Sequence, residues 1–171
     1  PYQPEVSQGT LQAIFEYQTL MTELTGMDIS NASHYDGATA TAEAANLAYH
    51  HFRGKRKKML VARSVNPEYR ETIRTYMTGL ENVIVHGDEP LNPGEDQISK
   101  LLGMIDKETA IVIVQYPDFF GRIIDYTKVV EKAHEFGALV AFVFNPTALG
   151  ILKPPGAFDA DIAVGDGQPL G

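Results

Sequence analysis

The run TAIVIVQY at residues 109–116 carries mostly apolar side chains on both faces of an extended chain. A strand can bury both of its faces only in a sheet that is covered on both sides, as the central strands of parallel sheets are. This run constrains the fold more than any other feature, because it requires helices above and below one sheet.

Strand-like runs and helix-like segments alternate along almost the whole sequence. We expect strands at residues 58–64, 82–87, 109–116, 138–144 and 161–164, with a loop at 88–93. The segments between them have the apolar spacing of amphipathic helices, and a first helix should begin at Ser7 or Thr10 and end at Gly26. The alternation predicts a single three-layer α/β/α domain over residues 1–171, with a mainly parallel sheet in the middle.

The formal net charge of −8 and the absence of cysteine limit the classes of function. An acidic chain is a poor partner for nucleic acid or for an anionic membrane, and no apolar run is long enough to span a bilayer. Without cysteine there is no disulfide framework and no thiolate nucleophile, and we expect a cytoplasmic location. The basic cluster at residues 53–58 is interpreted as a solvated turn before a strand.

The polar segment HYDG at residues 34–37 precedes an alanine-rich helix. Asp36 is a candidate N-cap, and Gly37 permits a tight turn. The amides of such a helix start, with the hydroxyls of Thr39 and Thr41 nearby, can bind a phosphate. Two interpretations stay open, because a capped buried helix has the same pattern and the charge of Asp36 would repel an anion.

The histidines and the common catalytic motifs indicate no other chemistry. His50 and His51 are adjacent and face different ways on a helix, so they do not form a metal pair. His86 and His134 lie in separate elements without ligand spacing, and we expect no metal site. The sequence contains no GxxxxGK[ST], GxGxxG, HExxH or GxSxG motif.

The pattern nearest to a known chemistry is that of a pyridoxal phosphate pocket. Such a pocket needs a phosphate-binding helix start, an acid for the pyridine nitrogen and a lysine for the Schiff base. The turn at Gly37 could serve as the first, and Asn145 ends a buried strand where the acid would stand. A neutral amide cannot keep the pyridine nitrogen protonated as a carboxylate does. Residues 165–169, where the lysine is expected, contain none, so the residues predict no Schiff base on this chain.

Two long blocks of the sequence resemble a known family. They are PYQPEVSQGTLQAIFEYQTLMTELTGMDISNASHYDGATATAEAA at the start and GILKPPGAFDADIAVGDGQPLG at the end. Both resemble the P-protein of the glycine cleavage system, glycine dehydrogenase (decarboxylating), and specifically its subunit 1, the alpha chain of two-subunit bacterial forms. The likeness runs the whole length, so we expect residues 1–171 to be the incomplete large domain of a longer chain.

The resemblance implies the fold of type I pyridoxal phosphate enzymes, with the cofactor and its lysine on the sister beta subunit and none bound covalently here. It implies glycine dehydrogenase (aminomethyl-transferring), which decarboxylates glycine and passes the aminomethyl group to lipoylated H-protein. Gly37, Ala38 and Thr39 match the phosphate-binding turn of the beta chain. Gln168 matches the neighbourhood of its lysine, and Asn145 departs from the acid expected in related alpha chains. The candidate residues of this degenerate pocket are Ser33, His34, Asp36, Gly37, Ala38, Thr39, Asn145 and Gln168.

Two other functions stay open from the sequence. Lys153, in the loop before the last strand, would be the residue of a self-sufficient pyridoxal phosphate enzyme. Alternatively, the chain would be a non-catalytic scaffold or binding protein with a degenerate type I fold. For the chain by itself we predict no turnover, because the nucleophilic lysine is absent from the pocket.

Overall fold

The structure is a computed structural model that describes residues 3–81, 83–87 and 96–171. Within these residues it contains a five-stranded sheet in the order β2-β1-β3-β4-β5. The strands are β1 (Lys58–Val61), β2 (Ile84–His86), β3 (Thr109–Tyr116), β4 (Leu139–Phe144) and β5 (Ile162–Val164). Every neighbouring pair is parallel, which confirms the predicted sheet. The loop predicted at 88–93 lies outside the described residues.

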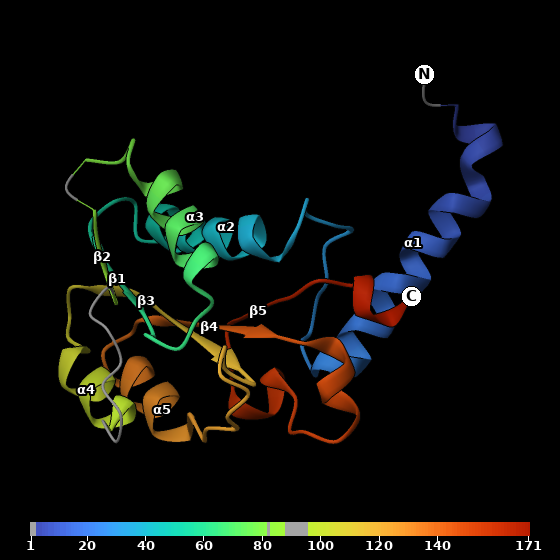
Figure 1. The fold of residues 1–171 in the computed structure, drawn as a ribbon. Coiled ribbons are helices and arrows are strands. Elements are labelled where there is room, and N and C mark those ends of the chain that lie inside the picture. Colours follow the sequence, from blue (N-terminus) through green and yellow to red (C-terminus); the bar gives the residue numbers. More distant parts are fainter. Residues whose placement is uncertain (1–2, 82, 88–95) are drawn as a thin grey trace.

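Helices cover both faces of the sheet (Figure 1). Helices α2 (Gly37–His51) and α3 (Pro67–Met77) lie on one face, and α4 (Gln97–Met104) and α5 (Thr127–Glu135) lie on the other. The short 3₁₀ helices are η1 (Pro146–Gly150), η2 (Pro155–Phe158) and η3 (Gln168–Leu170). The three-layer α/β/α arrangement expected from the sequence is therefore confirmed.

The core is centred on β3, the middle strand of the described sheet. Residues 109–114 have no exposed surface, as the apolar character of both strand faces predicts. Helix α2 contributes Ala42, Ala45 and Ala48, which are also fully buried. Small side chains allow a helix to approach its neighbours closely, so α2 lies near β4, β5 and α3 and its first residues stand beside the carboxyl end of β5.

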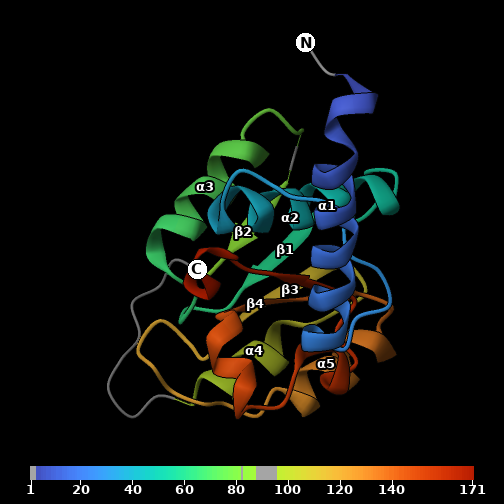
Figure 2. The ribbon, with the colours of Figure 1, turned by 90° about the vertical axis from the view of Figure 1, so that its right-hand side faces the viewer.

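Helix α1 (Pro4–Thr25) lies at one side of the sheet and projects away from the body of the molecule (Figures 1 and 2). Its predicted start at Ser7 or Thr10 is wrong, because Pro4 already occupies the first turn, where its missing N–H costs nothing. Its end is as predicted: Gly26 adopts φ +69° and its amide bonds to the carbonyl of Thr22.

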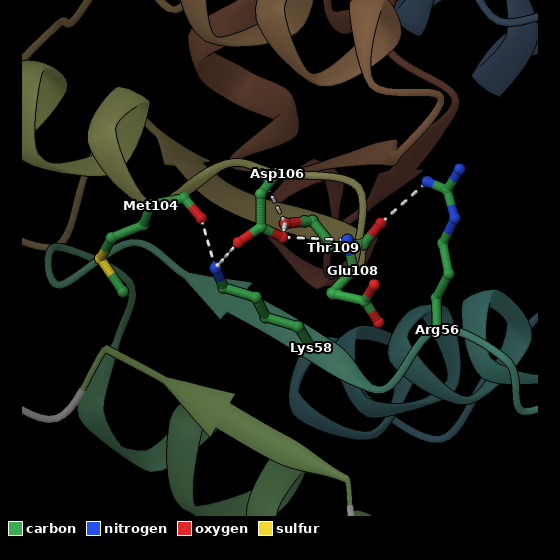
Figure 3. A network of polar contacts seen from close by, with 6 residues as sticks. All are labelled: Arg56, Lys58, Met104, Asp106, Glu108 and Thr109. Atoms are coloured by element: carbon green, nitrogen blue, oxygen red, sulfur yellow. Dashed lines mark hydrogen bonds and ion pairs between the residues drawn. The ribbon is translucent and has the colours of Figure 1, made fainter.

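Two members of the basic cluster at residues 53–58 are built into the structure, which corrects its interpretation as a solvated turn (Figure 3). The ammonium group of Lys58 lies 2.7 Å from Asp106 Oδ2 and 2.5 Å from the carbonyl oxygen of Met104. Arg56 Nη1 donates to the carbonyl of Thr109 at 3.0 Å. Arg56 thus binds the first residue of β3, and Lys58 binds the segment that connects α4 to this strand.

Candidate functional site

A cleft of about 690 Å³ lies beside β5. Its walls come from α1, from residues 27–36, from α2 and from the segment that follows β5. Four of the candidate residues line it, namely Ser33, His34, Asp36 and Gln168. The other four, Gly37, Ala38, Thr39 and Asn145, are not among its lining residues, so the cleft contains half of the predicted pocket.

The N-terminus of α2 is closed by a reciprocal capping box. Asp36 Oδ1 accepts the amide of Thr39 at 2.7 Å, and the hydroxyl of Thr39 accepts the amide of Asp36 at 3.2 Å. The predicted N-cap is therefore confirmed. The bonds from the Thr39 amide and hydroxyl favour the charged carboxylate and lower the pKa of Asp36 below its ordinary value.

A second carboxylate, that of Asp166, lies against the same helix end. Its Oδ1 accepts the amide of Gly37 at 2.7 Å, and its Oδ2 accepts the hydroxyl of Tyr69 at 2.9 Å. Burial raises the pKa of Tyr69, and the hydrogen bond to Asp166 raises it further. Asp166 follows β5 directly, so this carboxylate joins the end of the sheet to α2 and α3.

These contacts decide whether the turn fits the phosphate of a pyridoxal cofactor. The Gly37 amide is held by Asp166, the Thr39 amide by Asp36, and the Ala40 amide by the Asp36 carbonyl. The hydroxyl of Thr41 donates back to the carbonyl of Gly37 at 2.6 Å and does not point outward. The residues present do not fit a phosphate at this place.

The other two expected parts of a cofactor pocket have different contacts. Asn145 is exposed, and its Oδ1 accepts the amide and the hydroxyl of Thr147 at the start of η1. Gln168 lines the cleft but offers an amide where a Schiff base needs an amine. Lys153 is not among the cleft residues, and its ammonium group lies 3.9 Å from the centre of the Phe158 ring.

Sequence reasoning did not single out Tyr69 and Asp166. The signal available for Asp166 was its position directly after a strand, at the edge where ligands gather. Among the described residues, no cluster of three or more histidine, aspartate or glutamate side chains could hold a metal ion. In the same part of the chain, no helix has both the length and the apolar character needed to cross a membrane.

A parallel sheet with helices on both faces, and a cleft along its edge strand β5, defines a three-layer α/β domain. The family model described as "Glycine cleavage system P-protein" matches residues 1–171. The chain belongs to the glycine cleavage system P-protein family.

Individual relatives agree with the family. Three proteins, each named "Probable glycine dehydrogenase (decarboxylating) subunit 1", come from Lysinibacillus sphaericus, Desulforamulus reducens and Bacillus licheniformis and are 53%, 52% and 52% identical to this chain. Each match covers 100% of this chain and 37% of the relative. A crystal structure of glycine decarboxylase (P-protein) of the glycine cleavage system, in inhibitor-bound form, matches with a TM-score of 0.84 and 46% identity, over 99% of this chain and 37% of that one. The chain thus spans just over a third of the length of these proteins.

Proposed function

We propose that this chain is the central part of subunit 1 of glycine decarboxylase. The observation that carries the proposal is the family match over all of residues 1–171, supported by relatives that bear the name of subunit 1. In this proposal the whole enzyme decarboxylates glycine and transfers the aminomethyl group to lipoylated H-protein. The cytoplasm remains the expected compartment, with which a chain without cysteine is compatible.

The role assigned to this subunit is support of a sister subunit that carries pyridoxal phosphate. The contacts of the degenerate pocket favour that division of labour. Asp166 already holds the Gly37 amide, Asn145 caps η1, and Gln168 offers no amine. With no lysine at the cleft, we expect this chain to contribute surface and shape to the complex and no covalent chemistry.

Exposed apolar side chains on α1 support an assembly larger than residues 1–171. Val6, Phe15 and Leu20 are 80%, 65% and 62% exposed and lie on more than one side of this helix, and several large exposed apolar side chains on one element indicate contact with another surface. Ile29 and Tyr35, on the segment that follows, are even more exposed, at 86% and 93%. We expect the sister subunit or the remainder of the longer chain to cover these side chains.

Reconstitution tests the proposal directly. Full-length subunit 1, its sister subunit 2 and lipoylated H-protein are combined, and exchange between the glycine carboxyl group and labelled bicarbonate is measured. We expect exchange only when both subunits are present. Full exchange by subunit 2 and H-protein, unchanged when subunit 1 is added, would contradict the proposal.

Chemical trapping tests where the cofactor sits. The reconstituted enzyme is reduced with borohydride in the presence of pyridoxal phosphate, and the labelled lysine is mapped by mass spectrometry. We expect the label on subunit 2 only. Label on Lys153 would instead support a self-sufficient enzyme. In a separate pull-down with full-length subunit 1, the absence of subunit 2 among the bound proteins would support the scaffold function.

A further inference from the structure

Asp166 behaves as a ligand of the α2 N-terminus that is supplied by the chain itself. Its two oxygens accept from two different elements, the Gly37 amide at 2.7 Å and the Tyr69 hydroxyl at 2.9 Å. Asp166 lies 129 residues from Gly37 and 97 from Tyr69 in the sequence. Such a long-range arrangement fixes the carboxylate between α2, α3 and the end of β5.

The Asp166 carboxylate approaches Gly37 closely. Gly37 is buried, and a Cβ atom built on it would lie 2.7 Å from Asp166 Oδ2 and 2.5 Å from the Tyr69 hydroxyl. Both distances are too short for a methyl group unless these side chains move. The absence of a side chain at Gly37 therefore admits the carboxylate and the hydroxyl at these positions.

The charges at the α2 N-terminus also disfavour an external anion. A helix N-terminus carries about half a positive elementary charge, which favours a nearby anion. At α2 two carboxylates share it, since Asp36 accepts the Thr39 amide and Asp166 the Gly37 amide. An external phosphate would meet two negative charges, and the Gly37 and Thr39 amides already have acceptors.

We propose that Asp166 is a built-in anion that occupies the place of an external phosphate at the start of α2 and, together with Asp36, excludes the phosphate group of a cofactor from this chain. The inference stands on contacts within this chain and does not depend on the reaction of the whole protein. It predicts a latent site: with both carboxylates removed, the Gly37 amide is free to bind phosphate, and neither carboxylate repels it.

Inorganic phosphate is the probe, and full-length subunit 1 labelled with ¹⁵N-glycine is the protein. The Gly37 amide resonance, assigned through its loss in a Gly37→Ala variant, is followed during a phosphate titration with sodium chloride at equal ionic strength as the control. In the wild type we expect no saturable shift of this resonance. In Asp36→Ser/Asp166→Ala we expect a saturable shift. The Kd for phosphate in this variant should be at least about tenfold lower than any Kd that fits the wild-type titration.

Serine in the double variant retains an N-cap without charge, so α2 keeps its cap. Glu23→Ala/Asp28→Ala is the matched control, because it removes two charges from exposed side chains elsewhere and should respond as the wild type does. A saturable shift of Gly37 in the wild type would overturn the inference, and this measurement requires no variant to fold. A double variant with unchanged circular dichroism and no phosphate response would overturn it as well.

Discussion

The ammonium group of Lys58 lies 2.7 Å from Asp106 Oδ2, across the amino-terminal ends of β1 and β3. The Lys58 side chain is 18% exposed and that of Asp106 is 49% exposed. Lys58 also donates to the Met104 carbonyl at the end of α4. The pair therefore fastens β1 to the connection between α4 and β3.

Lys58→Met should lower the stability of the full-length subunit by about 1 kcal/mol, since a partly buried charged hydrogen bond is lost while solvent screens the exposed half of the pair. Thermal unfolding measures the effect. Asp106→Asn and the double variant complete a cycle, and an additive double variant would show that the two side chains do not interact.

The same pair predicts a pH dependence. The hydrogen bond from Lys58 is the largest cause that lowers the pKa of Asp106 below its ordinary value of 3.8. A lowered folded-state pKa adds stability above pH 3.8, and this contribution is lost as the pH falls through the lowered value. Lys58→Met should therefore lose less stability than the wild type on acidification below about pH 4. An identical acid profile for both proteins would contradict the assignment.

Arg56 is expected to be irreplaceable by lysine. One of its terminal nitrogens donates to the carbonyls of Thr109, Phe136 and Gly137 at 3.0, 3.0 and 2.8 Å, and its guanidinium carbon lies 4.4 Å from the centre of the Phe52 ring. A lysine side chain has no planar guanidinium group that could stack on the Phe52 ring while its terminal nitrogen donates to these carbonyls.

Arg56→Lys should destabilise the subunit by about 1 kcal/mol, because the partly buried bonds to the carbonyls of Thr109 and Phe136 lose their guanidinium donor. Lys55→Met is the matched control, since Lys55 belongs to the same basic cluster but is exposed. Its unfolding temperature should equal that of the wild type. Equal decreases of the unfolding temperature in the two variants would contradict a specific stabilising role of Arg56.

The sequence was sufficient wherever the signal was local. Strand-like apolar runs that alternate with amphipathic helical segments predicted the parallel sheet. Gly26 predicted the end of α1 and Asp36 the cap of α2, because each depends only on nearby residues. The strands at 58–64 and 82–87 were predicted longer than the observed β1 and β2, because a residue pattern does not mark the last ladder hydrogen bond of a strand.

Long-range contacts were beyond the reach of pattern reading. The bond between Gly37 and Asp166 joins residues 129 positions apart, and that between Arg56 and Thr109 joins residues 53 apart. The residues next to Gly37 or Arg56 in the sequence do not indicate which distant residue each of them contacts. The sequence pointed to the start of α2 as a candidate site, while the Asp166 carboxylate that lies against it could be found only from the fold.

The close approach of Gly156 and Gly26 predicts a position that tolerates no side chain. A Cβ on Gly156 would lie 2.0 Å from the Gly26 carbonyl oxygen, and backbone on that side cannot rotate away as a side chain can. Gly156→Ala should cost about 1–3 kcal/mol, the range of overpacked interiors. Thermal unfolding measures this loss of stability. We also expect looser packing between the end of α1 and η2 in this variant.

Gly9→Ala is the control for that substitution. Gly9 lies inside α1, and no atom stands within 4 Å of the place that an added methyl group would take, so alanine should stabilise the helix by up to about 1 kcal/mol. The two glycine-to-alanine changes are thus expected to have opposite signs. Tolerance of alanine at Gly156 would mean that α1 and η2 do not meet as the structure describes.

The cap of α2 provides the last prediction. Asp36→Ala should cost about 1 kcal/mol, because the Thr39 amide loses its acceptor, whereas Asp36→Ser should retain most of the stability. Hydrogen exchange at the amides of the first turn of α2 measures the effect locally, where fraying precedes global unfolding.

Since the pKa of Asp36 is lowered by Thr39, the cap's contribution is present above pH 3.8 and is lost as the pH falls through the lowered pKa. Asp36→Ser should therefore show exchange protection at Thr39 that does not change between neutral and acidic pH, and equal acid sensitivity of the serine variant and the wild type would contradict a cap that acts through charge.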